Sequence, residues 1–291
     1  MWVSEHWKDY ELLDCSGGEK LERWGQYVLR RPDPQAIWQT PKDRHWDRAD
    51  AVYRRSESGG GKWIKSDVPE AWQIREGNLT FNVKLMNFKH TGIFPEQAAN
   101  WAFIDEAVRH AGRSIRVLNL FAYTGAASLA AAAAGASVCH VDAAKGMVAW
   151  AKENAAASGL ADKPIRWIVD DCRKFVEKEI RRGKTYDAII MDPPSYGRGP
   201  TGEVWKLEDS LWDFLQLCCG VLSENPLFVL ISSYTTGLQP AVLTYLAETV
   251  FSGRFGGRAE SRELGLPVEK NGLILPCGAA CRWRGKTSED D

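Results

Sequence analysis

The sequence predicts an α/β protein with a doubly wound parallel sheet, preceded by a smaller and mainly β segment. Short apolar runs bounded by turn residues predict strands at residues 115–120, 137–141, 165–169, 187–191 and 227–232. Segments with helical spacing alternate with these runs, at residues 125–134, 145–158, 173–182 and 208–222. Several runs end in acidic or polar residues, at the edge where such sheets bind their ligands.

The first two predicted strands and the helix between them have the layout of a nucleoside-binding half-sheet. The run 115–120 leads into a turn at Tyr123-Thr124-Gly125, and the alanine-rich block 126–134 has a strong helix preference. The next strand ends in Asp142. An acid at that position holds ribose hydroxyls in such sheets, so Asp142 is expected to bind a nucleoside.

The glycine pattern of this turn narrows the ligand. A dinucleotide fingerprint needs GxGxxG, whereas this turn holds only Gly125, beside the bulky Phe121 and Tyr123. A ligand without a pyrophosphate fits better, and S-adenosylmethionine is the common ligand of that kind. The alternative is that the segment is only a strand-to-helix turn of another α/β protein.

Composition describes an ordinary globular protein. The chain has 291 residues, of which 44% are hydrophobic and 26% charged, and its net charge of −1 announces no polyanionic partner, although a local basic patch would suffice for one. No apolar run approaches the roughly 20 residues that span a bilayer, and the N-terminus does not resemble a signal peptide. The seven cysteines include no CxxC pair, so we expect reduced thiols in a cytoplasmic protein and no metal; a zinc site at Cys277 and Cys281 is disfavoured.

Residues 1–89 differ in texture from the rest and predict a small, mainly β N-terminal domain, followed by a second domain over 90–291. The first segment holds seven of the thirteen tryptophans, strand-like pieces at 26–29 and 79–85, and a flexible loop at 58–61. The tryptophans could stack on bases, but a role in the hydrophobic core is favoured. A helix is expected from Gln97 to Arg109, and a final pair of strands at 259–264 and 273–283.

Two further acidic motifs fall at predicted strand ends. Asp171, in the segment Asp170-Asp171-Cys172, can accept the exocyclic amine of an adenine or can cap the following helix, and the sequence leaves both open. The segment Asp192-Pro193-Pro194-Ser195-Tyr196 is more specific. It places a carboxylate at the sheet edge, leaves the carbonyls beside the prolines free to accept hydrogen bonds, and offers an aromatic ring for stacking. Such a site suits methylation of an amino nitrogen by positioning and electrostatics, although a rigid strand exit is the alternative.

Other segments are weaker candidates. Residues 231–237 could line a substrate pocket and contain no cysteine, and the glycine-rich segment 197–202 is expected to close over substrate, with Arg198 and Lys206 available to phosphates. No metal-binding, P-loop or serine-hydrolase motif is present. A basic cluster could face RNA, although a solvated helix face is the commoner explanation. Its members are Arg173, Lys174, Lys178, Arg181, Arg182 and Lys184.

Together these motifs resemble the class I S-adenosylmethionine-dependent methyltransferases, and more closely the bacterial 23S ribosomal RNA methyltransferases of the large-subunit methyltransferase I/K type. The resemblance covers about residues 70–240 and depends on HTGIFPEQ, LNLFAYTGAASLAAAAAGA, Asp142, DDCRKF and DPPSY. It implies a Rossmann-like sheet of seven strands with the last antiparallel, which suits the pair of strands expected in the tail.

The resemblance also implies roles for individual residues. For the cofactor, Phe121, Tyr123, Thr124 and Gly125 would wrap the methionine end, Asp142 would hold the ribose, Asp171 and Cys172 the adenine, and Gln97 would lie nearby. For the reaction, Asp192, Pro193 and Tyr196 would face the methyl group and the acceptor base, so that Asp192 serves both sets.

Two departures from the family matter. Cytosine-C5 members carry a cysteine after the fifth strand, where this chain has Ser232, Ser233 and Tyr234, and serine is a poor substitute for a thiolate. The N-terminal region also does not match the RNA-binding module that many members carry.

The resulting hypothesis is a cytoplasmic methyltransferase that acts on a base nitrogen in RNA, ribosomal RNA above all, with S-adenosylmethionine as cofactor and without a metal or a membrane. The alternatives are a methyltransferase for a protein or small-molecule amine, and a catalytically silent RNA-binding protein with the same fold. The oligomeric state is left open by the sequence, a dimer included.

Overall fold

The computed structural model describes residues 1–56, 60–65, 68–198 and 204–286. The chain forms two compact units, each made from two segments. The smaller unit combines Met1–Ala99 with Leu264–Cys277, and the larger combines Asn100–Glu263 with Gly278–Asp291. The sequence also predicts that two functional domains meet after residue 89, and this boundary stays a prediction.

The smaller unit is built mainly from β-strands. Its five-stranded sheet has the order β2-β3-β4-β5-β6, and a separate hairpin pairs β7 with β8. The strands are β2 (Tyr10–Ser16), β3 (Glu19–Trp24), β4 (Tyr27–Pro32), β5 (Ala51–Arg55), β6 (Gly61–Lys65), β7 (Trp72–Glu76) and β8 (Leu79–Val83). Two short 3₁₀ helices complete the unit, η1 (Trp46–Arg48) and η2 (Pro95–Gln97). The predicted flexible loop at 58–61 begins outside the described residues, and only Gly60 and Gly61 of it are placed.

The tryptophans of the smaller unit are structural. Trp24 and Trp46 are almost completely buried, and the other five are partly buried. Several indole nitrogens also bond within the unit: Trp46 donates to the Asp14 carboxylate at 2.9 Å and Trp72 to the Trp24 carbonyl oxygen at 3.1 Å. Because these rings fill the interior and their N–H groups are used there, the core interpretation favoured from the sequence fits the structure.

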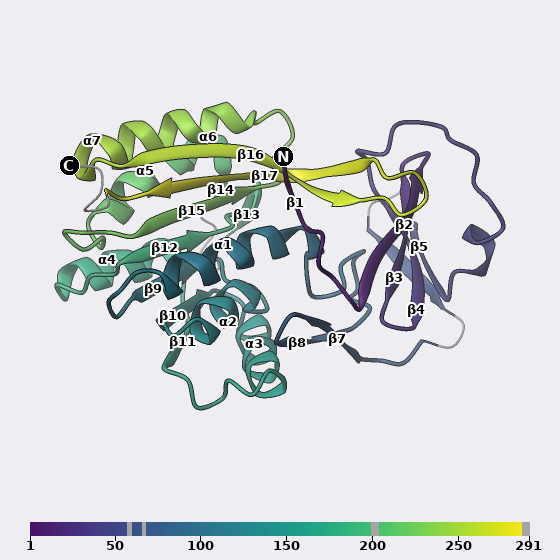
Figure 1. The fold of residues 1–291 in the computed structure, drawn as a ribbon, viewed down its shortest axis with the longest axis horizontal. Helices are drawn as coiled ribbons and strands as arrows, with labels where there is room; N and C mark the ends of the chain where they lie inside the picture. Colours follow the sequence, from purple (N-terminus) through teal and green to yellow (C-terminus); the bar gives the residue numbers. More distant parts are fainter. Residues whose placement is uncertain (57–59, 66–67, 199–203, 287–291) are drawn as a thin grey trace. The chain divides into compact units, whose positions relative to one another are not determined.

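The sheet of the larger unit has the order β16-β17-β15-β12-β9-β10-β11 (Figure 1). Its strands are β9 (Arg116–Leu120), β10 (Ser137–Asp142), β11 (Ile165–Val169), β12 (Ala188–Met191), β15 (Phe228–Ser233), β16 (Arg258–Pro267) and β17 (Ile274–Arg284). The five strands from β15 to β11 pair in parallel and β17 pairs antiparallel with β15, so the predicted mixed α/β fold is confirmed. The two-residue strand β1 (Trp2–Val3) adds an eighth member through Leu264 and Gly265 of β16.

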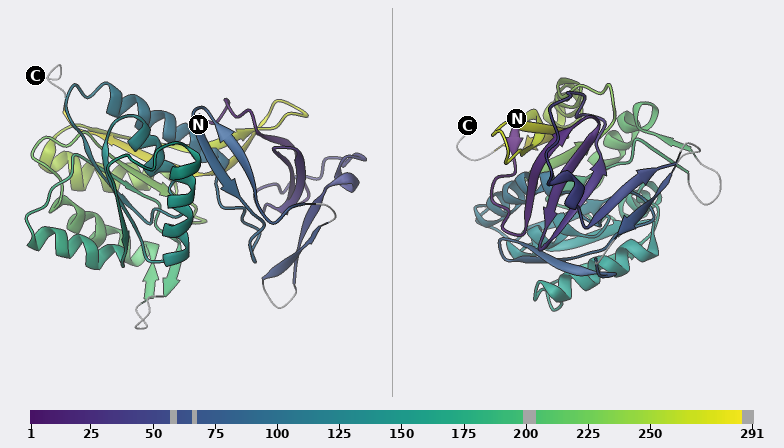
Figure 2. Two further views of the ribbon diagram at one scale, coloured as in Figure 1. Left: turned by 90° about the horizontal axis from the view of Figure 1, so that it is seen from below. Right: turned by 90° about the vertical axis from the view of Figure 1, so that its right-hand side faces the viewer.

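Helices cover both faces of this sheet, as the left view in Figure 2 shows. On one face lie α1 (Ala98–Arg109), α2 (Ala126–Ala133) and α3 (Lys145–Ala157); on the other lie α4 (Cys172–Arg181), α5 (Leu207–Cys219) and α6 (Pro240–Ala247). The π-helical turn η3 (Glu248–Ser252) and α7 (Gly253–Phe255) continue α6, and a small hairpin of β13 (Tyr196–Arg198) and β14 (Val204–Lys206) follows β12. No helix in the described ranges combines the length and apolar composition that crossing a bilayer requires.

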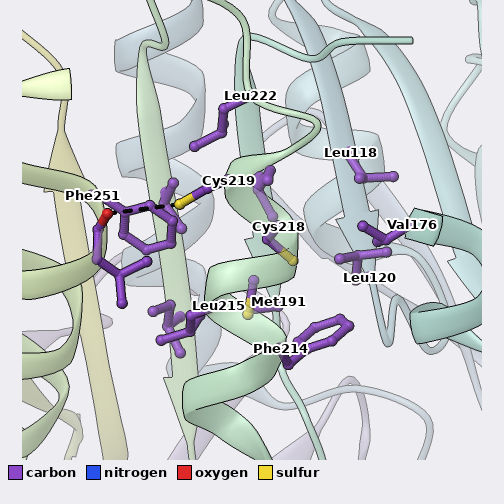
Figure 3. Packing of buried hydrophobic residues seen from close by; sticks show 14 of the residues in the cluster. Leu118, Leu120, Val176, Met191, Phe214, Leu215, Cys218, Cys219, Leu222 and Phe251 are labelled. Carbon is purple, nitrogen blue, oxygen red and sulfur yellow. Dashed lines mark hydrogen bonds between the residues drawn. The ribbon is translucent and has the colours of Figure 1, made fainter. Parts of the chain in front are cut away.

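A large hydrophobic cluster fills the space between the sheet and α4, α5 and α6 (Figure 3). Phe214 and Phe251 are completely buried there, and the Cys219 thiol donates to the Val250 carbonyl oxygen at 3.7 Å. Burial of each such aromatic side chain contributes about 1.5–3 kcal/mol. Packing against α4, α5 and α6 therefore holds the strands rigidly, and this fixes the positions of the residues at their ends.

The elements predicted over residues 115–232 agree with the observed ones to within about three residues, whereas α6 was not predicted. The sequence predicts helix to residue 222, but α5 ends at Cys219. Gly220 disfavours continuation, and the Val221 carbonyl oxygen accepts a hydrogen bond from the Tyr186 N–H at 2.7 Å. Leu222, the next residue, forms an isolated bridge with Tyr186 in the segment before β12.

Candidate active site

Four neighbouring strands end at the same level, so the residues that follow them form one row along the carboxyl edge. The register pairs Leu120 with Val141 on one side and with Met191 on the other, and Met191 with Ile231. The next residue of each strand lies one step further along, and the row reads Asp142, Phe121, Asp192 and Ser232. Adjacent strands are about 4.8 Å apart, which separates the Asp142 and Asp192 backbones by roughly 10 Å.

The turn after β9 has a backbone that most residues avoid. Phe121 and Tyr123 have φ values of 54° and 49°, the two non-glycine residues with positive φ in the described part of the chain, and Gly125 has 90°. Such conformations cost on the order of 1–3 kcal/mol each and persist only where the surroundings impose them. A Cβ atom at Gly125 would lie 2.8 Å from the Cβ of Ala151, so only glycine fits there.

Asp142 imposes this conformation. One of its carboxylate oxygens accepts the Tyr123 N–H at 2.8 Å and the other accepts the Ala144 N–H at 2.8 Å. Burial raises the pKa of this carboxyl above its ordinary value, against the opposing effect of these two hydrogen bonds. Because each oxygen has a second lone pair, the carboxylate can still accept hydrogen bonds from a pair of hydroxyls. The tight turn and this acceptor pair fit a nucleoside cofactor without a pyrophosphate.

The second acidic motif performs the capping role that the sequence left open. Asp171 is the N-cap of α4, and its side chain accepts the Lys174 N–H at 2.9 Å. The Cys172 thiol is buried under the first turn and accepts the Phe121 N–H at 3.2 Å. Burial raises the pKa of this thiol well above its usual value, so Cys172 is inert. Contacts of Asp171 and Cys172 with an adenine stay predictions.

The Asp192-Pro193-Pro194-Ser195 segment is tied down by hydrogen bonds from distant parts of the chain. The Trp205 indole N–H donates to the Pro194 carbonyl oxygen at 2.6 Å, and the Leu207 N–H donates to the Ser195 carbonyl oxygen at 3.0 Å. The Thr235 hydroxyl donates to the Ser195 hydroxyl at 2.7 Å. The expectation that the prolyl carbonyls are free therefore needs correction for Pro194, because the indole engages its oxygen.

An aromatic cluster joins this segment to the turn after β9. Trp205 lies with its ring centroid 5.5 Å from that of Phe121 and 5.6 Å from that of Phe214, and Phe121 and Phe214 are also 5.6 Å apart. Phe121 therefore packs on protein as well as lining the edge. Trp205 was not among the predicted site residues, because it belongs to no recognised motif, whereas Thr235 lies in the segment 231–237 that was predicted to line a substrate pocket. Tyr196, the predicted stacking residue, begins β13 with 54% of its surface exposed.

The remaining predicted residues are more scattered. Ser232 and Ser233 are buried in β15, and the Ser233 hydroxyl accepts the Thr235 N–H at 3.2 Å. Of the predicted closing segment, residues 199–202 lie outside the described residues, and Lys206 forms an ion pair with Asp209 at 3.2 Å. Gln97 ends η2 in the smaller unit, and its role near the cofactor stays a prediction.

A group of buried, hydrogen-bonded polar side chains adjoins the turn after β9. This group was not predicted from the sequence. The Asn119 amide donates to the Ser128 hydroxyl at 2.9 Å, and that hydroxyl lies 3.0 Å from Nδ1 of His140. His140 is completely buried, which lowers its pKa to about 3, so the ring is neutral. The Asn154 amide donates to the Thr124 carbonyl oxygen at 2.9 Å. The available signal was one polar residue inside each apolar strand, Asn119 in β9 and His140 in β10.

Comparison with known proteins identifies this architecture. A sequence profile described as S-adenosylmethionine-dependent methyltransferase matches residues 26–208. A crystal structure of the SAM-dependent methyltransferase from Agrobacterium tumefaciens is 40% identical, with a TM-score of 0.92 over 98% of this chain and 93% of that chain. A putative SAM-dependent methyltransferase from Streptococcus mutans shares the fold, with 21% identity and a TM-score of 0.73 over 96% of this chain and 76% of that one.

A curated relative gives a more specific name over a shorter stretch. The ribosomal RNA large subunit methyltransferase K/L of Chromohalobacter salexigens is 31% identical over 165 residues, which is 56% of this chain and 21% of the relative. The chain thus spans about a fifth of the length of the curated relatives that it matches.

Proposed function

The chain belongs to the S-adenosylmethionine-dependent methyltransferase family, and we propose that it methylates a nitrogen of a base in RNA, with ribosomal RNA as the expected substrate. The observation that carries this proposal is the position of Asp192-Pro193-Pro194 at the carboxyl end of β12, in the same row as Asp142. The family's cofactor, S-adenosylmethionine, supplies an electrophilic methyl group on a sulfonium.

Residues of this chain would hold the cofactor at the β9–β10 end of the row. Asp142 has acceptor capacity for ribose hydroxyls, and the turn from Phe121 to Gly125 gives the backbone a tight bend beside it. Asp171 and the backbone amide of Cys172 would contact the adenine at the neighbouring strand end. Asp170 N–H donates to the Asp142 carbonyl oxygen at 3.2 Å, which keeps these two strand ends together.

Asp192 would then act on the acceptor. Its partly buried carboxylate can accept a hydrogen bond from an exocyclic amino group, which orients the nitrogen lone pair. The carboxylate would also stabilise the positive charge that develops on the nitrogen, and it can accept the proton that the nitrogen loses as the new N–C bond forms. Pro193 would position the carbonyl beside it, and Tyr196 would stack on the base.

The side chains at this edge favour a nitrogen acceptor over the C5 carbon of cytosine. Carbon methylation requires a thiolate to add to the ring first. β15 ends in two buried serines, Ser232 and Ser233. The Cys172 thiol accepts a hydrogen bond from the Phe121 N–H, and burial raises its pKa strongly. RNA as the acceptor is supported by the name of the curated relatives, which are ribosomal RNA methyltransferases.

Nucleoside mass spectrometry on undermethylated ribosomal RNA, incubated with the protein and labelled S-adenosylmethionine, tests the proposal. Labelled methylguanosine or methyladenosine is the expected product and would name the acceptor atom. Labelled 5-methylcytidine would overturn the argument from the missing cysteine. No labelled nucleoside, with cofactor binding intact, would overturn the RNA substrate.

The net charge of −1 favours a second candidate, a protein or small-molecule amine as the acceptor. The same labelled donor, incubated with a cell extract treated with ribonuclease, separates the two. Label in protein or in small molecules and none in RNA would support this candidate. No transfer to any fraction, with RNA binding retained, would instead indicate a silent RNA-binding protein.

A further inference from the structure

Helix α3 has one polar residue on its buried face. The other buried residues of the helix are Val148, Trp150, Ala151 and Ala155, and among them lies Asn154 with 1% of its surface exposed. Asparagine is a poorer helix former than alanine, and a buried amide destabilises a fold unless it is hydrogen-bonded. An asparagine at this position is therefore unfavourable for the helix itself, which indicates that its amide serves another element.

That element is the turn after β9. The Asn154 amide donates to the carbonyl oxygen of Thr124 at 2.9 Å, and Thr124 is also only 1% exposed. Thr124 lies between Tyr123, with a φ of 49°, and Gly125, with a φ of 90°. The hydrogen bond therefore fixes the peptide group between Thr124 and Gly125, in a segment whose conformation its surroundings have to impose.

Asp142 holds the same turn, but its carboxylate has more than one task. Its oxygens accept the N–H groups of Tyr123 and Ala144, and the same oxygens are expected to accept the ribose hydroxyls. The bond from Asn154 lies in the interior, where neither a ligand nor water competes for it. It can therefore hold the turn in one conformation whether or not a cofactor is bound.

The neighbouring buried polar side chains do not act on the turn in this way. The Asn119 amide donates to the Ser128 hydroxyl, which lies 3.0 Å from Nδ1 of His140. Within the described ranges, these side-chain bonds connect β9, α2 and β10, and none of them reaches the backbone of residues 121–125. Asn154 is thus the member of this buried polar group that bonds to the turn.

We propose that Asn154 is a positioning residue for the cofactor: its hydrogen bond to Thr124 keeps the turn in the conformation that binds S-adenosylmethionine. This inference rests on the placement of the cofactor at the turn under the proposed function. Without the bond, the turn can relax to a backbone of lower strain, and the cofactor then binds only the fraction of molecules that keep the strained form. The apparent dissociation constant rises as that fraction falls.

Calorimetric titration with S-adenosylhomocysteine tests the inference without any methyl acceptor. In Asn154→Ala the Thr124 carbonyl oxygen loses its donor inside the protein, so the dissociation constant should rise by about tenfold. Saturating S-adenosylmethionine should restore the strained turn by mass action. The KM for the cofactor should therefore rise while kcat stays close to the wild-type value. An unchanged dissociation constant would overturn the inference.

Asn154→Leu separates the hydrogen bond from the shape of the side chain. Leucine has the same branching as asparagine but no donor, so it leaves the Thr124 oxygen without a partner and opens no cavity. Asn154→Leu should therefore bind S-adenosylhomocysteine as weakly as Asn154→Ala does. Wild-type affinity in Asn154→Leu would show that packing and not the donor matters, and this would overturn the inference.

Tyr186→Phe is the matched control for stability. It removes a buried hydroxyl that donates to Glu179 at 2.6 Å, in the segment before β12 and so at the opposite end of the sheet from the turn. This variant should melt at a lower temperature than the wild type and bind S-adenosylhomocysteine with wild-type affinity. Equal losses of affinity in Tyr186→Phe and Asn154→Ala would show that affinity follows overall stability, which would overturn the inference.

The inference and the placement of the cofactor fail differently. Wild-type affinity in Asn154→Ala, together with weak binding in Asp142→Ala, would remove the positioning role of Asn154 and leave the cofactor at the turn. Wild-type affinity in both variants would overturn the placement as well. Neither result depends on the acceptor, so the nucleoside assay tests the RNA substrate separately.

Discussion

The indole nitrogen of Trp205 lies 2.6 Å from the carbonyl oxygen of Pro194 and donates a hydrogen bond to it. The ring that carries this nitrogen packs against Phe121, which begins the turn beside Asp142. One side chain therefore connects the segment proposed to hold the acceptor with the turn proposed to hold the cofactor. Such a contact fixes the spacing between two reactants, which is where positioning affects rate most.

Replacement of Trp205 by phenylalanine should separate positioning from folding. Trp205→Phe keeps an aromatic ring and loses the donor, so kcat is expected to fall by roughly tenfold to a hundredfold. The free energy of unfolding should fall by only about 1 kcal/mol. Trp212→Phe is the matched control, because Trp212 lies on α5 with 42% of its surface exposed. Full activity in Trp205→Phe would show that the hydrogen bond has no positioning role.

Asp192→Ala should strongly reduce turnover and leave cofactor binding unchanged. Loss of a charge aimed at the developing cation is expected to lower kcat by about 10²–10³-fold. Calorimetry with S-adenosylhomocysteine should give the wild-type affinity. Asp209→Ala serves as a control, since Asp209 is an exposed carboxylate paired with Lys206. Unchanged turnover would exclude Asp192 from the mechanism.

Asp142→Ala should weaken cofactor binding and also lower the stability of the fold. Two hydrogen bonds to ribose would be lost, at about 1.5–3 kcal/mol each for a charged acceptor, so S-adenosylhomocysteine should bind at least about a hundredfold more weakly. The melting temperature should also fall without cofactor, because the Tyr123 and Ala144 N–H groups lose their acceptor. Asp142→Asn retains one acceptor oxygen, so its affinity for S-adenosylhomocysteine should lie between those of the wild type and Asp142→Ala. Wild-type affinity in Asp142→Ala would place the ribose elsewhere.

Gly125→Ala should be more destabilising than an ordinary substitution at positive φ. Gly112→Ala is the matched control: Gly112 has φ 64°, and its added Cβ would meet nothing within 4 Å. The control should therefore show only the backbone cost, about 1 kcal/mol. At Gly125 the 2.8 Å approach to Ala151 adds steric strain, and urea unfolding should show about 1–3 kcal/mol more. Equal losses at both positions would show that α3 relaxes without cost.

His140 should make stability fall as the pH is lowered. Its folded-state pKa is about 3 because of burial, against an ordinary value of 6.5. Between these values the unfolded chain binds a proton that the folded chain does not. Stability from this group is therefore complete above about pH 6.5 and is lost as the pH falls toward 3.

Urea unfolding between about pH 6 and pH 5, where few carboxylates titrate, measures this effect. His140→Gln should be less stable at neutral pH, but its free energy of unfolding should fall less steeply with pH, by about 1.4 kcal/mol per pH unit. His90, whose pKa burial lowers to about 4, contributes a similar slope in both proteins. Parallel pH profiles for the wild type and the variant would contradict the assignment.

The sheet was predictable from sequence because buried parallel strands are uninterrupted apolar runs. The run 187–191 corresponds to β12, Ala188–Met191, in which all four residues are apolar and buried. The role of Asp171 was not predictable, since an N-cap and a ligand contact need the same residue type at the same position. Trp205 was beyond prediction for another reason. Its partner, the Pro194 carbonyl oxygen, depends on how the β13–β14 hairpin folds back, and nothing local encodes that path.

The two-segment composition of the smaller unit has a consequence for biosynthesis. Lys270 forms an ion pair with the buried Asp14 at 2.6 Å, and Leu264 pairs with Trp2. Residues 1–99 therefore leave the ribosome long before the partners that complete their unit are translated. During that interval the early segment is exposed to proteases and chaperones, while the intervening larger unit can begin to form. Premature termination before residue 264 would then damage the unit translated first, although the stop lies far downstream of it.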